Sequence, residues 1–301
     1  MTFSVKMTHF SGSVRTPTGT DTDVGAVARL RTAMSSVTLG QPNKPPQPPR
    51  VDLESLFRLK YGDPETTGWG PRLRHSFGYF TPDDHYEATI AALVRKGCRW
   101  LDVGSGRSLF PSNAQLARTL ADRCGILVGL DPDDTLDANP YVHERVKSTL
   151  EEFDSISSFD LATLRMVAEH IAEPASAVSA LARLVRRGGK VVIYTVNQWT
   201  PMALASWLVP LRLHLPVNRL LWGTKQRDTF PVTYRMNTRR RLAGLFKTHG
   251  FRESSFAYLD DCRTFHRFRQ LHRLELRFWR LLRSLGLRYP ETCLLGVYER
   301  Q

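Results

Sequence analysis

At 301 residues, the chain is long enough to form one large domain with a substantial core, and it needs neither disulfides nor a structural metal to fold. Hydrophobic residues make up 42% and charged residues 24%, which excludes wholly disordered, collagen-like and polytopic membrane chains. The four cysteines are scattered without a Cys-x-x-Cys pair. This spacing argues against a disulfide scaffold or a cysteine zinc site, and it favours a reducing, cytoplasmic compartment.

The formal net charge of +13 is concentrated in one region of the chain. Residues 201–301 hold 19 lysines and arginines against seven acidic residues. The first two hundred residues are therefore almost neutral. Basicity is a property of the C-terminal third and not of the chain as a whole.

The first fifty residues have the composition of a tail. They are rich in Thr, Ser, Gly and Pro, and residues 41–49 contain so many prolines that an extended conformation is favoured. We interpret residues 1–50 as a mostly disordered tail without a secretory signal, and residues 51–301 as one domain. The most apolar stretch, residues 202–222, is interrupted by proline, arginine and histidine and should not cross a bilayer.

An aromatic, turn-forming segment at residues 77–84 precedes a predicted helix at residues 85–95. Such a segment can cover a site, which makes Tyr79, Phe80 and Tyr86 candidate contacts with an acceptor substrate. Aromatic packing of an N-terminal helix onto a sheet explains the same residues equally well.

The pattern between residues 98 and 131 predicts a ligand site. A short apolar strand ends at Val103 and is followed by Gly104-Ser105-Gly106, a helix over residues 112–123 and a second strand over residues 125–130 that is closed by Asp131. Glycines let the backbone approach a ligand closely, and amides at a helix start offer hydrogen-bond donors. An acid that ends the second strand suits the two hydroxyls of a ribose.

The same alternation continues along the chain. Further strands are expected at residues 144–146, 159–164, 190–196, 251–259 and 292–298, and helices at residues 175–186, where Gly188-Gly189 is the stop signal, and 238–249. Strands that alternate with helices imply an α/β fold with a doubly wound, mostly parallel sheet and ligands at the carboxyl ends of its strands.

Four segments in the right order and spacing resemble the class I S-adenosylmethionine-dependent methyltransferases. Residues 101–106 (LDVGSG) resemble the first motif of the family and residues 128–131 (VGLD) the second. Residues 159–171 are similar to the family's "FDLV…LEHV" segment, and residues 184–192 to its "LKPGG" entry into strand five. The resemblance implies a seven-stranded sheet with an antiparallel last strand, and insertions after strand five and between strands six and seven. It places the cofactor core at residues 99–197.

The resemblance also implies roles for individual residues toward S-adenosylmethionine. The loop Gly104, Ser105 and Gly106 would pass under the methionine part, and Asp102 would hold that region. Asp131 would accept hydrogen bonds from the ribose. The remaining contacts would be Leu150 and Glu151 beside the adenine, and Arg165 and Met166 at the sulfonium. This chain has Ser108 where the family often has a third glycine.

Two other interpretations of this region are possible. A nicotinamide dinucleotide is the competing cofactor, but its fingerprint requires a glycine where this chain has Leu109. His170 is a candidate general base for methyl transfer, because it follows strand four. The Glu169-His170 pair can equally be structural.

Residues 198–237 form a long insertion at the carboxyl edge of the predicted sheet, where an acceptor pocket would lie. Tyr234 and Arg235 are the candidate acceptor contacts. A structured lid with a satisfied ion pair is the alternative.

A basic amphipathic helix is predicted at residues 263–285, with apolar residues at three-to-four spacing from Phe265 to Leu285 and arginines on its other faces. It could lie on anionic lipid, bind nucleic acid, or pack on the domain with a solvated arginine face. Packing is the commonest outcome for such a stripe, and nucleic acid is the least favoured because no separate binding module is present.

The sequence as a whole predicts transfer of a methyl group to a small-molecule or lipid-linked acceptor, with oxygen as the expected acceptor atom and no dedicated metal site. A membrane-associated or scaffold protein that retains the fold without catalysis is the alternative. The intact Asp102, Gly104, Gly106 and Asp131 argue against a degenerate site.

Overall fold

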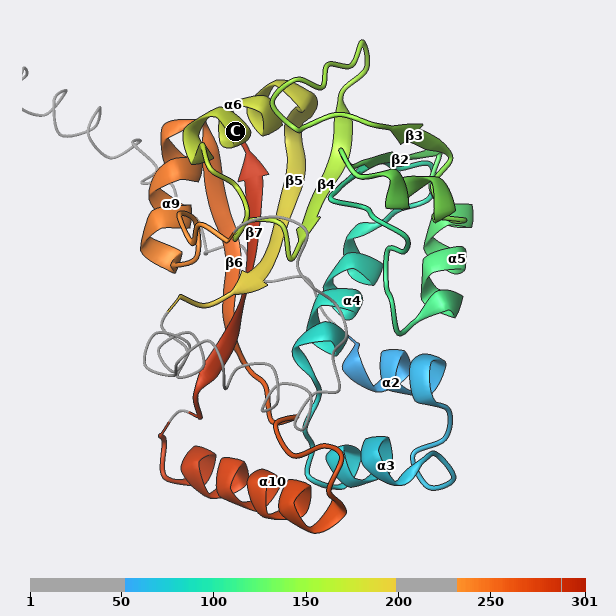
Figure 1. Ribbon diagram of the computed structural model, residues 1–301, viewed down its shortest axis with the longest axis vertical. Coiled ribbons are helices and arrows are strands. Elements are labelled where there is room, and N and C mark those ends of the chain that lie inside the picture. The colour runs from blue at the N-terminus through green and yellow to red at the C-terminus, as the bar shows by residue number, and fades with distance from the viewer. Residues whose placement is uncertain (1–51, 199–231, 288) are drawn as a thin grey trace, which may run out of the picture. The chain divides into compact units, whose positions relative to one another are not determined.

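A mixed seven-stranded sheet is the centre of the computed structural model, which describes residues 52–198, 232–287 and 289–301 (Figure 1). The strands are β1 (Arg99–Val103), β2 (Ile126–Leu130), β3 (Glu144–Val146), β4 (Phe159–Arg165), β5 (Val185–Val196), β6 (Phe251–Asp260) and β7 (Glu291–Arg300). Their order across the sheet is β3-β2-β1-β4-β5-β7-β6. The first five strands are parallel, and β7 runs antiparallel to both of its neighbours. The predicted doubly wound α/β sheet with an antiparallel last strand is confirmed.

Local signals in the sequence set where the helices begin. Thr81 forms a capping box with Asp84 before α4, and the side chains of Asn113 and Thr238 cap α5 and α9. The described helices are α2 (Leu53–Tyr61), α3 (Trp69–Ser76), α4 (Pro82–Leu93), α5 (Ala114–Arg123), α6 (Pro174–Leu184), α9 (Arg239–Thr248) and α10 (Arg269–Ser284), with a 3-10 turn at Asp134–Ala138. None of these helices is both long and apolar enough to cross a bilayer.

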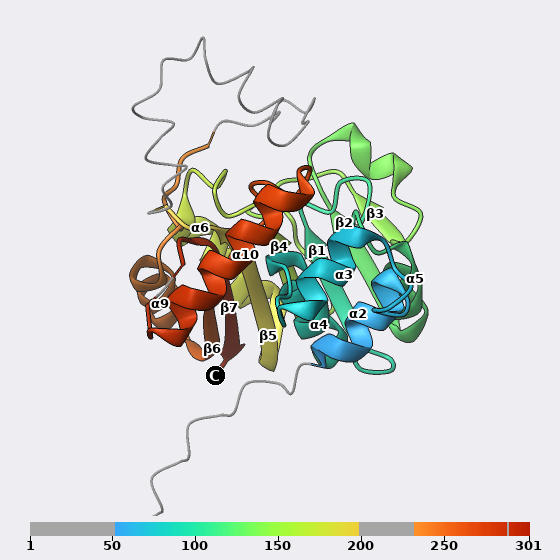
Figure 2. The ribbon, with the colours of Figure 1, turned by 90° about the horizontal axis from the view of Figure 1, so that it is seen from below.

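Helices cover both faces of the sheet, so each face has its own core. On one face, Trp100, Leu127 and Val192 pack with residues of α2, α4 and α5. On the other face, Leu101 and Ile193 pack with residues of α6 and α9. Successive strand residues therefore point to opposite cores, as the pleat of a strand requires. The arrowheads of β4 and β5 point toward α3 and α10 (Figure 1), which lie across that end of the sheet when it is seen from below (Figure 2).

The structure differs from the sequence prediction around Gly188-Gly189. These glycines lie inside β5 and do not stop a helix, since α6 already ends at Leu184. The register between β4 and β5 shifts between Phe159 and Leu161, which places the glycines beside this irregularity. An added Cβ at Gly189 would lie 2.8 Å from the backbone oxygen of Arg186, so close backbone approach explains the glycine.

Two predicted segments fall mostly outside the described residues. The tail at residues 1–50 is wholly outside them, and so is most of the insertion at residues 198–237, of which residues 198 and 232–237 are described. The predicted basic helix at residues 263–285 corresponds to α10, preceded by a turn over residues 263–268.

Candidate functional site

The glycine loop lies directly after β1, at the carboxyl edge of the sheet. Gly104 and Gly106 both have left-handed backbone conformations, with φ of 67° and 46°. The backbone N–H of Gly104 donates to the carbonyl of Leu130, 2.7 Å away, which ties the loop to the end of β2. A Cβ at Gly104 would lie only 2.2 Å from Cγ2 of Val167. Position 104 therefore requires glycine for two reasons: its backbone conformation is left-handed, and Val167 leaves no room for a Cβ.

We expect Gly104→Ala to lower the free energy of unfolding by about 2 kcal/mol, of which about 1 kcal/mol comes from the left-handed conformation and the rest from the contact with Val167. Urea unfolding measures this change. Gly250→Ala is the matched control, because Gly250 has φ of 78° with no atom near its missing Cβ, so that only the conformational part is lost. Equal losses at both positions would contradict a steric role of Val167.

Two polar side chains hold the glycine loop in place. Asp131, which follows β2, accepts hydrogen bonds from the backbone N–H of Gly106 and of Asp133, each at 2.9 Å. The amide of Asn139 is fully buried and donates to the carbonyls of Ser105 and Gly106 at 3.3 and 3.2 Å. The sequence analysis missed Asn139, since it comes after a short 3-10 turn whose return to the loop has no local signal.

Asp102 is a buried carboxyl group within β1, two residues before Gly104. Its Oδ1 accepts a hydrogen bond of 2.6 Å from Thr163 Oγ1, which in turn accepts one of 2.7 Å from Trp100 Nε1. Burial raises the pKa of Asp102 to about 6, although the hydrogen bond from Thr163 acts in the opposite direction. Because a nearby cation favours the ionised form of a carboxyl group, an ammonium group beside Asp102 would lower this raised pKa and ionise the side chain.

A charged network that the sequence analysis did not anticipate lies at the same edge. Arg165 at the end of β4 pairs with Asp83 of α4 at 3.1 Å, and Arg263 pairs with the same carboxylate at 2.9 Å. Arg263 also pairs with Asp261 at 2.6 Å. Burial alone would raise the pKa of Asp83, but the two guanidinium groups hold it below its usual value. The prediction that Arg263 lies on an outer basic face is wrong, since its charge is used inside this network.

Of the aromatic candidate acceptor contacts, Tyr79 and Tyr86 pack inside the domain, whereas Phe80 is half-buried and its contact with an acceptor stays a prediction. The Tyr79 hydroxyl donates to the carbonyl of Asp260 and accepts from the backbone N–H of Cys262, both at 2.9 Å, and its side chain is buried. Tyr86 is also buried and stacks on Tyr194 of β5, with ring centroids 5.0 Å apart. Tyr79 is therefore placed as a tether between two loops, and its position does not support contact with an acceptor.

The segment after β4 anchors residues 232–237. The carboxylate of Glu169 accepts a hydrogen bond of 2.7 Å from Thr195 Oγ1, and its backbone carbonyl accepts from the N–H of Thr233 and Tyr234. Thr195 Oγ1 also accepts from Asn237 Nδ2 at 2.8 Å. Glu169 thus has a structural role. The neighbouring His170 is half-buried, and its role as a general base stays a prediction.

The two acceptor candidates of the insertion have different surroundings. Arg235 donates to the carbonyl of Ala172 at 2.6 Å and pairs with Glu173 at 3.3 Å, with more than half of its side chain exposed. This matches the alternative of a satisfied ion pair. Tyr234 is half-buried with a left-handed φ of 52°. Its contact with an acceptor stays a prediction.

The remaining cofactor candidates are not all accessible. Met166 adopts a left-handed φ of 52° directly after β4, and its N–H donates to the carbonyl of Tyr194 at 2.8 Å. Leu150 is part of the second core, whereas Glu151 beside it is exposed. The structure therefore brings Asp102, the glycine loop, Asp131, Arg165 and Met166 to one edge of the sheet, while Leu150 faces the core.

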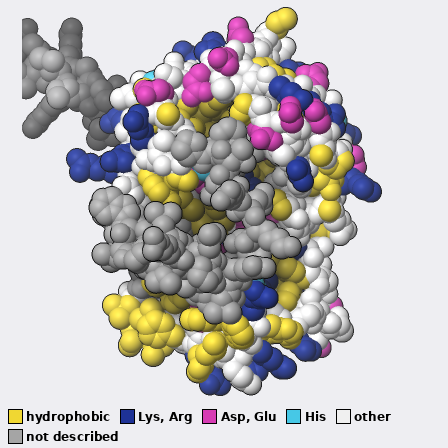
Figure 3. Space-filling model, viewed as in Figure 1, with side chains coloured by type: hydrophobic (Ala, Val, Ile, Leu, Met, Phe, Trp, Pro, Cys, Tyr) yellow, Lys and Arg dark blue, Asp and Glu magenta, His cyan; other side chains and the backbone are white. Residues whose placement is uncertain are grey.

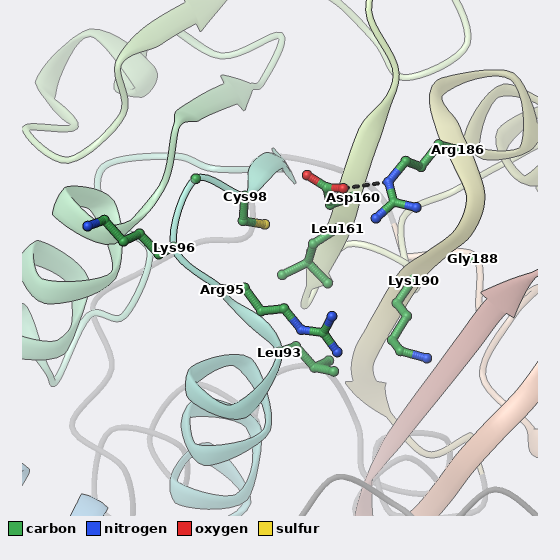
Figure 4. A pocket seen from close by; sticks show the side chains of 10 residues that line it. Leu93, Arg95, Lys96, Cys98, Asp160, Leu161, Arg186, Gly188 and Lys190 are labelled. Carbon is green, nitrogen blue, oxygen red and sulfur yellow. Dashed lines mark hydrogen bonds and ion pairs between the residues drawn. The ribbon is translucent and has the colours of Figure 1, made fainter.

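A cavity of about 310 Å³ lies at the opposite, amino-terminal edge of the parallel strands (Figure 4). Arg95, Lys96, Arg186 and Lys190 line it together with Asp160. Asp160 pairs with Arg186 at 2.5 Å, and Lys190 pairs with Glu299 at 2.5 Å. This cavity is separate from the glycine loop, so we do not assign it to the candidate site.

Within the described part of the chain, no group of three His, Cys, Asp or Glu residues is placed to hold a metal ion.

Comparison with known proteins agrees with this geometry. A family model described as a methyltransferase domain matches residues 77–253, more than half of the chain. The ubiquinone biosynthesis O-methyltransferase of Xanthomonas oryzae pv. oryzae is 35% identical over 123 residues, which cover 40% of this chain and 51% of the relative. The protein of the same name from Hydrogenovibrio crunogenus is 26% identical over 189 residues, 59% of this chain and 72% of the relative. For the first of these relatives, the chain spans about half of its length.

Among solved structures, an S-adenosylmethionine-dependent methyltransferase from Mesorhizobium loti aligns with a TM-score of 0.46 at 15% identity, covering 73% of this chain and 98% of that one. A likeness at this level carries no argument about the site. The match to the family model does, since it contains the glycine loop, Asp131 and the segment after β4. The chain therefore belongs to the methyltransferase domain family, in its class I, S-adenosylmethionine-dependent form.

Proposed function

We propose that the protein transfers the methyl group of S-adenosylmethionine to an oxygen atom of a small-molecule or lipid-linked acceptor. The observation that carries this proposal is the glycine loop held between Asp102 and Asp131 in a domain of the methyltransferase family. The curated relatives are named as ubiquinone biosynthesis O-methyltransferases, which supports oxygen as the acceptor atom and a lipid-linked acceptor.

The residues of the loop fit the cofactor. Each carboxylate oxygen of Asp131 accepts one backbone N–H and keeps a further lone pair, so that ribose hydroxyls can still donate to it. Gly104 and Gly106 present backbone without a side chain, which leaves room for the methionine part. Asp102 can ionise to balance an ammonium group. The bound cofactor supplies an activated methyl group on a sulfonium.

The protein's own contribution to the reaction is alignment and proton removal. Methyl transfer is an in-line displacement, so holding the acceptor oxygen in line with the methyl group supplies much of the rate. A hydroxyl acceptor must also lose its proton. His170 is the predicted base, because it follows β4 at the same edge as Met166.

Calorimetric titration of the ligand-free protein with S-adenosylmethionine tests the proposal. We expect Asp131→Ala to lower the affinity about tenfold to a hundredfold, since it removes charge-assisted hydrogen bonds to the cofactor and releases the N–H of Gly106. Asp122→Ala, an exposed acid on α5, is the matched control and should bind as the native chain does.

NAD serves as the competing ligand in the same titration. Binding of NAD in place of S-adenosylmethionine would contradict the proposal. No binding of either ligand to a folded protein would favour a scaffold that keeps the fold without catalysis.

A further inference from the structure

Helix α10 presents one row of apolar side chains to solvent, on the side away from the buried Leu276 and Trp279. Six apolar residues at three-to-four spacing are between 44% and 63% exposed, and we call them the apolar face of α10: Phe268, Leu271, Leu274, Phe278, Leu281 and Leu285. Hydrophobic side chains accordingly gather over α10 at the lower end of the molecule (Figure 3). Of the alternatives for this helix, packing of the whole apolar stripe on the domain does not hold for these six residues. A continuous exposed apolar surface marks an interaction site.

The inward face of α10 explains why the apolar face points outward. The carboxylate of the buried Glu275 accepts hydrogen bonds from the backbone N–H of Thr264 and Phe265 and from the Tyr289 hydroxyl, at 3.1–3.3 Å. Trp279 Nε1 donates to Asp260 at 2.9 Å, and its ring meets the Tyr79 ring edge-on. Rotating the helix to bury the leucines would break all of these contacts. The orientation is therefore fixed by the fold.

The positive charge of α10 favours an anionic partner for its apolar face. The helix carries five arginines and a single acid, Glu275, which is buried. Arg273, Arg277 and Arg280 project from a row that borders the apolar face, because residues three and four apart share one side of a helix. Long arginine side chains can keep their charge at phosphate depth while the adjacent leucines and phenylalanines enter the acyl region.

We propose that α10 lies in the headgroup region of an anionic bilayer, with its apolar face inserted and the arginine row among the lipid phosphates. A second copy of the chain fits this face less well, since two α10 helices would bring two arginine rows together. The helix lies at the end of the sheet toward which β4 and β5 run (Figures 1 and 2), so docking turns the edge with the glycine loop toward the membrane. The inference does not depend on the proposed methyl transfer.

Vesicle flotation with the full chain tests the apolar part of the surface. We expect the native chain to bind vesicles of phosphatidylcholine with phosphatidylglycerol. Partitioning of Leu274→Ser/Phe278→Ser into the same vesicles should be weaker than that of the native chain by about tenfold or more. Both side chains are more than half exposed, so the fold should be preserved. Ile156→Ser is the matched control, because Ile156 is fully exposed on the loop before β4. Equal partitioning of the double variant and the native chain would overturn the proposal.

The charged part is tested with the same vesicles and with phosphatidylcholine alone. Arg277→Gln/Arg280→Gln should lower partitioning to anionic vesicles about tenfold and make it less sensitive to salt. Arg118→Gln/Arg240→Gln removes two exposed arginines from α5 and α9 and should change little. If the native chain binds neither kind of vesicle, the proposal is overturned. It is also overturned by a dimer in light scattering that Leu274→Ser/Phe278→Ser dissociates, which would assign the face to a second copy.

Discussion

Replacing Lys60 with methionine is expected to lower the free energy of unfolding by about 3–5 kcal/mol, which is the cost of breaking a buried ion pair on one side. The Lys60 ammonium, only 1% exposed, donates to Asp84 at 3.0 Å and to Glu87 at 2.8 Å. Burial alone would lower the pKa of Lys60, but the two carboxylates raise it above its usual value. The variant leaves two acids buried without their cation.

The loss in Lys60→Met should also depend on pH. Burial already raises the pKa of Glu87 despite the nearby ammonium, and removing Lys60 raises it further. The folded variant then binds a proton more tightly than the unfolded chain does, so its stability falls as the pH rises from 5 to 8. Urea unfolding of both proteins across this range measures the effect.

Two further variants separate the ion pair from a general loss of charge. Lys247→Met changes an exposed lysine of α9 and should shift stability by no more than about 0.5 kcal/mol. Adding Glu87→Gln to Lys60→Met should restore part of the loss, because one of the two stranded carboxylates is gone. A double variant that is less stable than Lys60→Met would contradict this explanation.

The parts of the fold that the sequence predicted depend on local signals. The strand β1, the glycine loop and β2 with Asp131 follow one another within about thirty residues, and each has a recognisable residue pattern. Helix α9 begins directly after Thr238, the first residue of its predicted range, whereas the capping box at Thr81 starts α4 three residues before the helix predicted at residues 85–95. A single sequence contains this information directly, since the residues that interact are neighbours in the chain.

The features that could not be predicted from the sequence depend on contacts between residues that are far apart in the chain. Asp83 and Arg263 are 180 positions apart, and Lys60 meets its acids across a helix–helix contact. Nothing in a local pattern pairs these charges. The orientation of α10 is a similar case: periodicity shows that the helix is amphipathic, whereas Glu275 and Trp279 decide through tertiary hydrogen bonds which face is buried.

The ionisation of Asp102 should produce the second large effect, a loss of about 3 kcal/mol in the stability of the native chain relative to Asp102→Asn between pH 3 and pH 7. Burial raises the pKa of Asp102 in the folded state from 3.8 to about 6. Below pH 3 the carboxyl group is protonated in both states and contributes no difference. As the pH rises, the unfolded chain ionises first, so the folded state loses stability until Asp102 itself ionises.

Urea unfolding of the native chain and Asp102→Asn at half-unit steps from pH 3 to pH 7.5 measures this difference, in which the titrations of other groups cancel. Asparagine can still accept the hydrogen bond from Thr163 Oγ1, so the fold should be preserved. In Thr163→Val the carboxylate loses this donor, which raises the pKa of Asp102 further. The stability of this variant should therefore continue to fall with rising pH above pH 6. A difference that stays constant with pH would contradict the raised pKa.

The same measurement connects Asp102 to the proposed function. If its carboxylate balances the ammonium group of bound S-adenosylmethionine, the ligand should lower the pKa of Asp102, because a nearby cation favours the ionised form. With saturating ligand, the fall in the stability of the native chain relative to Asp102→Asn between pH 3 and pH 7 should then become smaller. An unchanged fall in the presence of bound ligand would place the ammonium group away from Asp102 and leave the cofactor to be held by the glycine loop and Asp131.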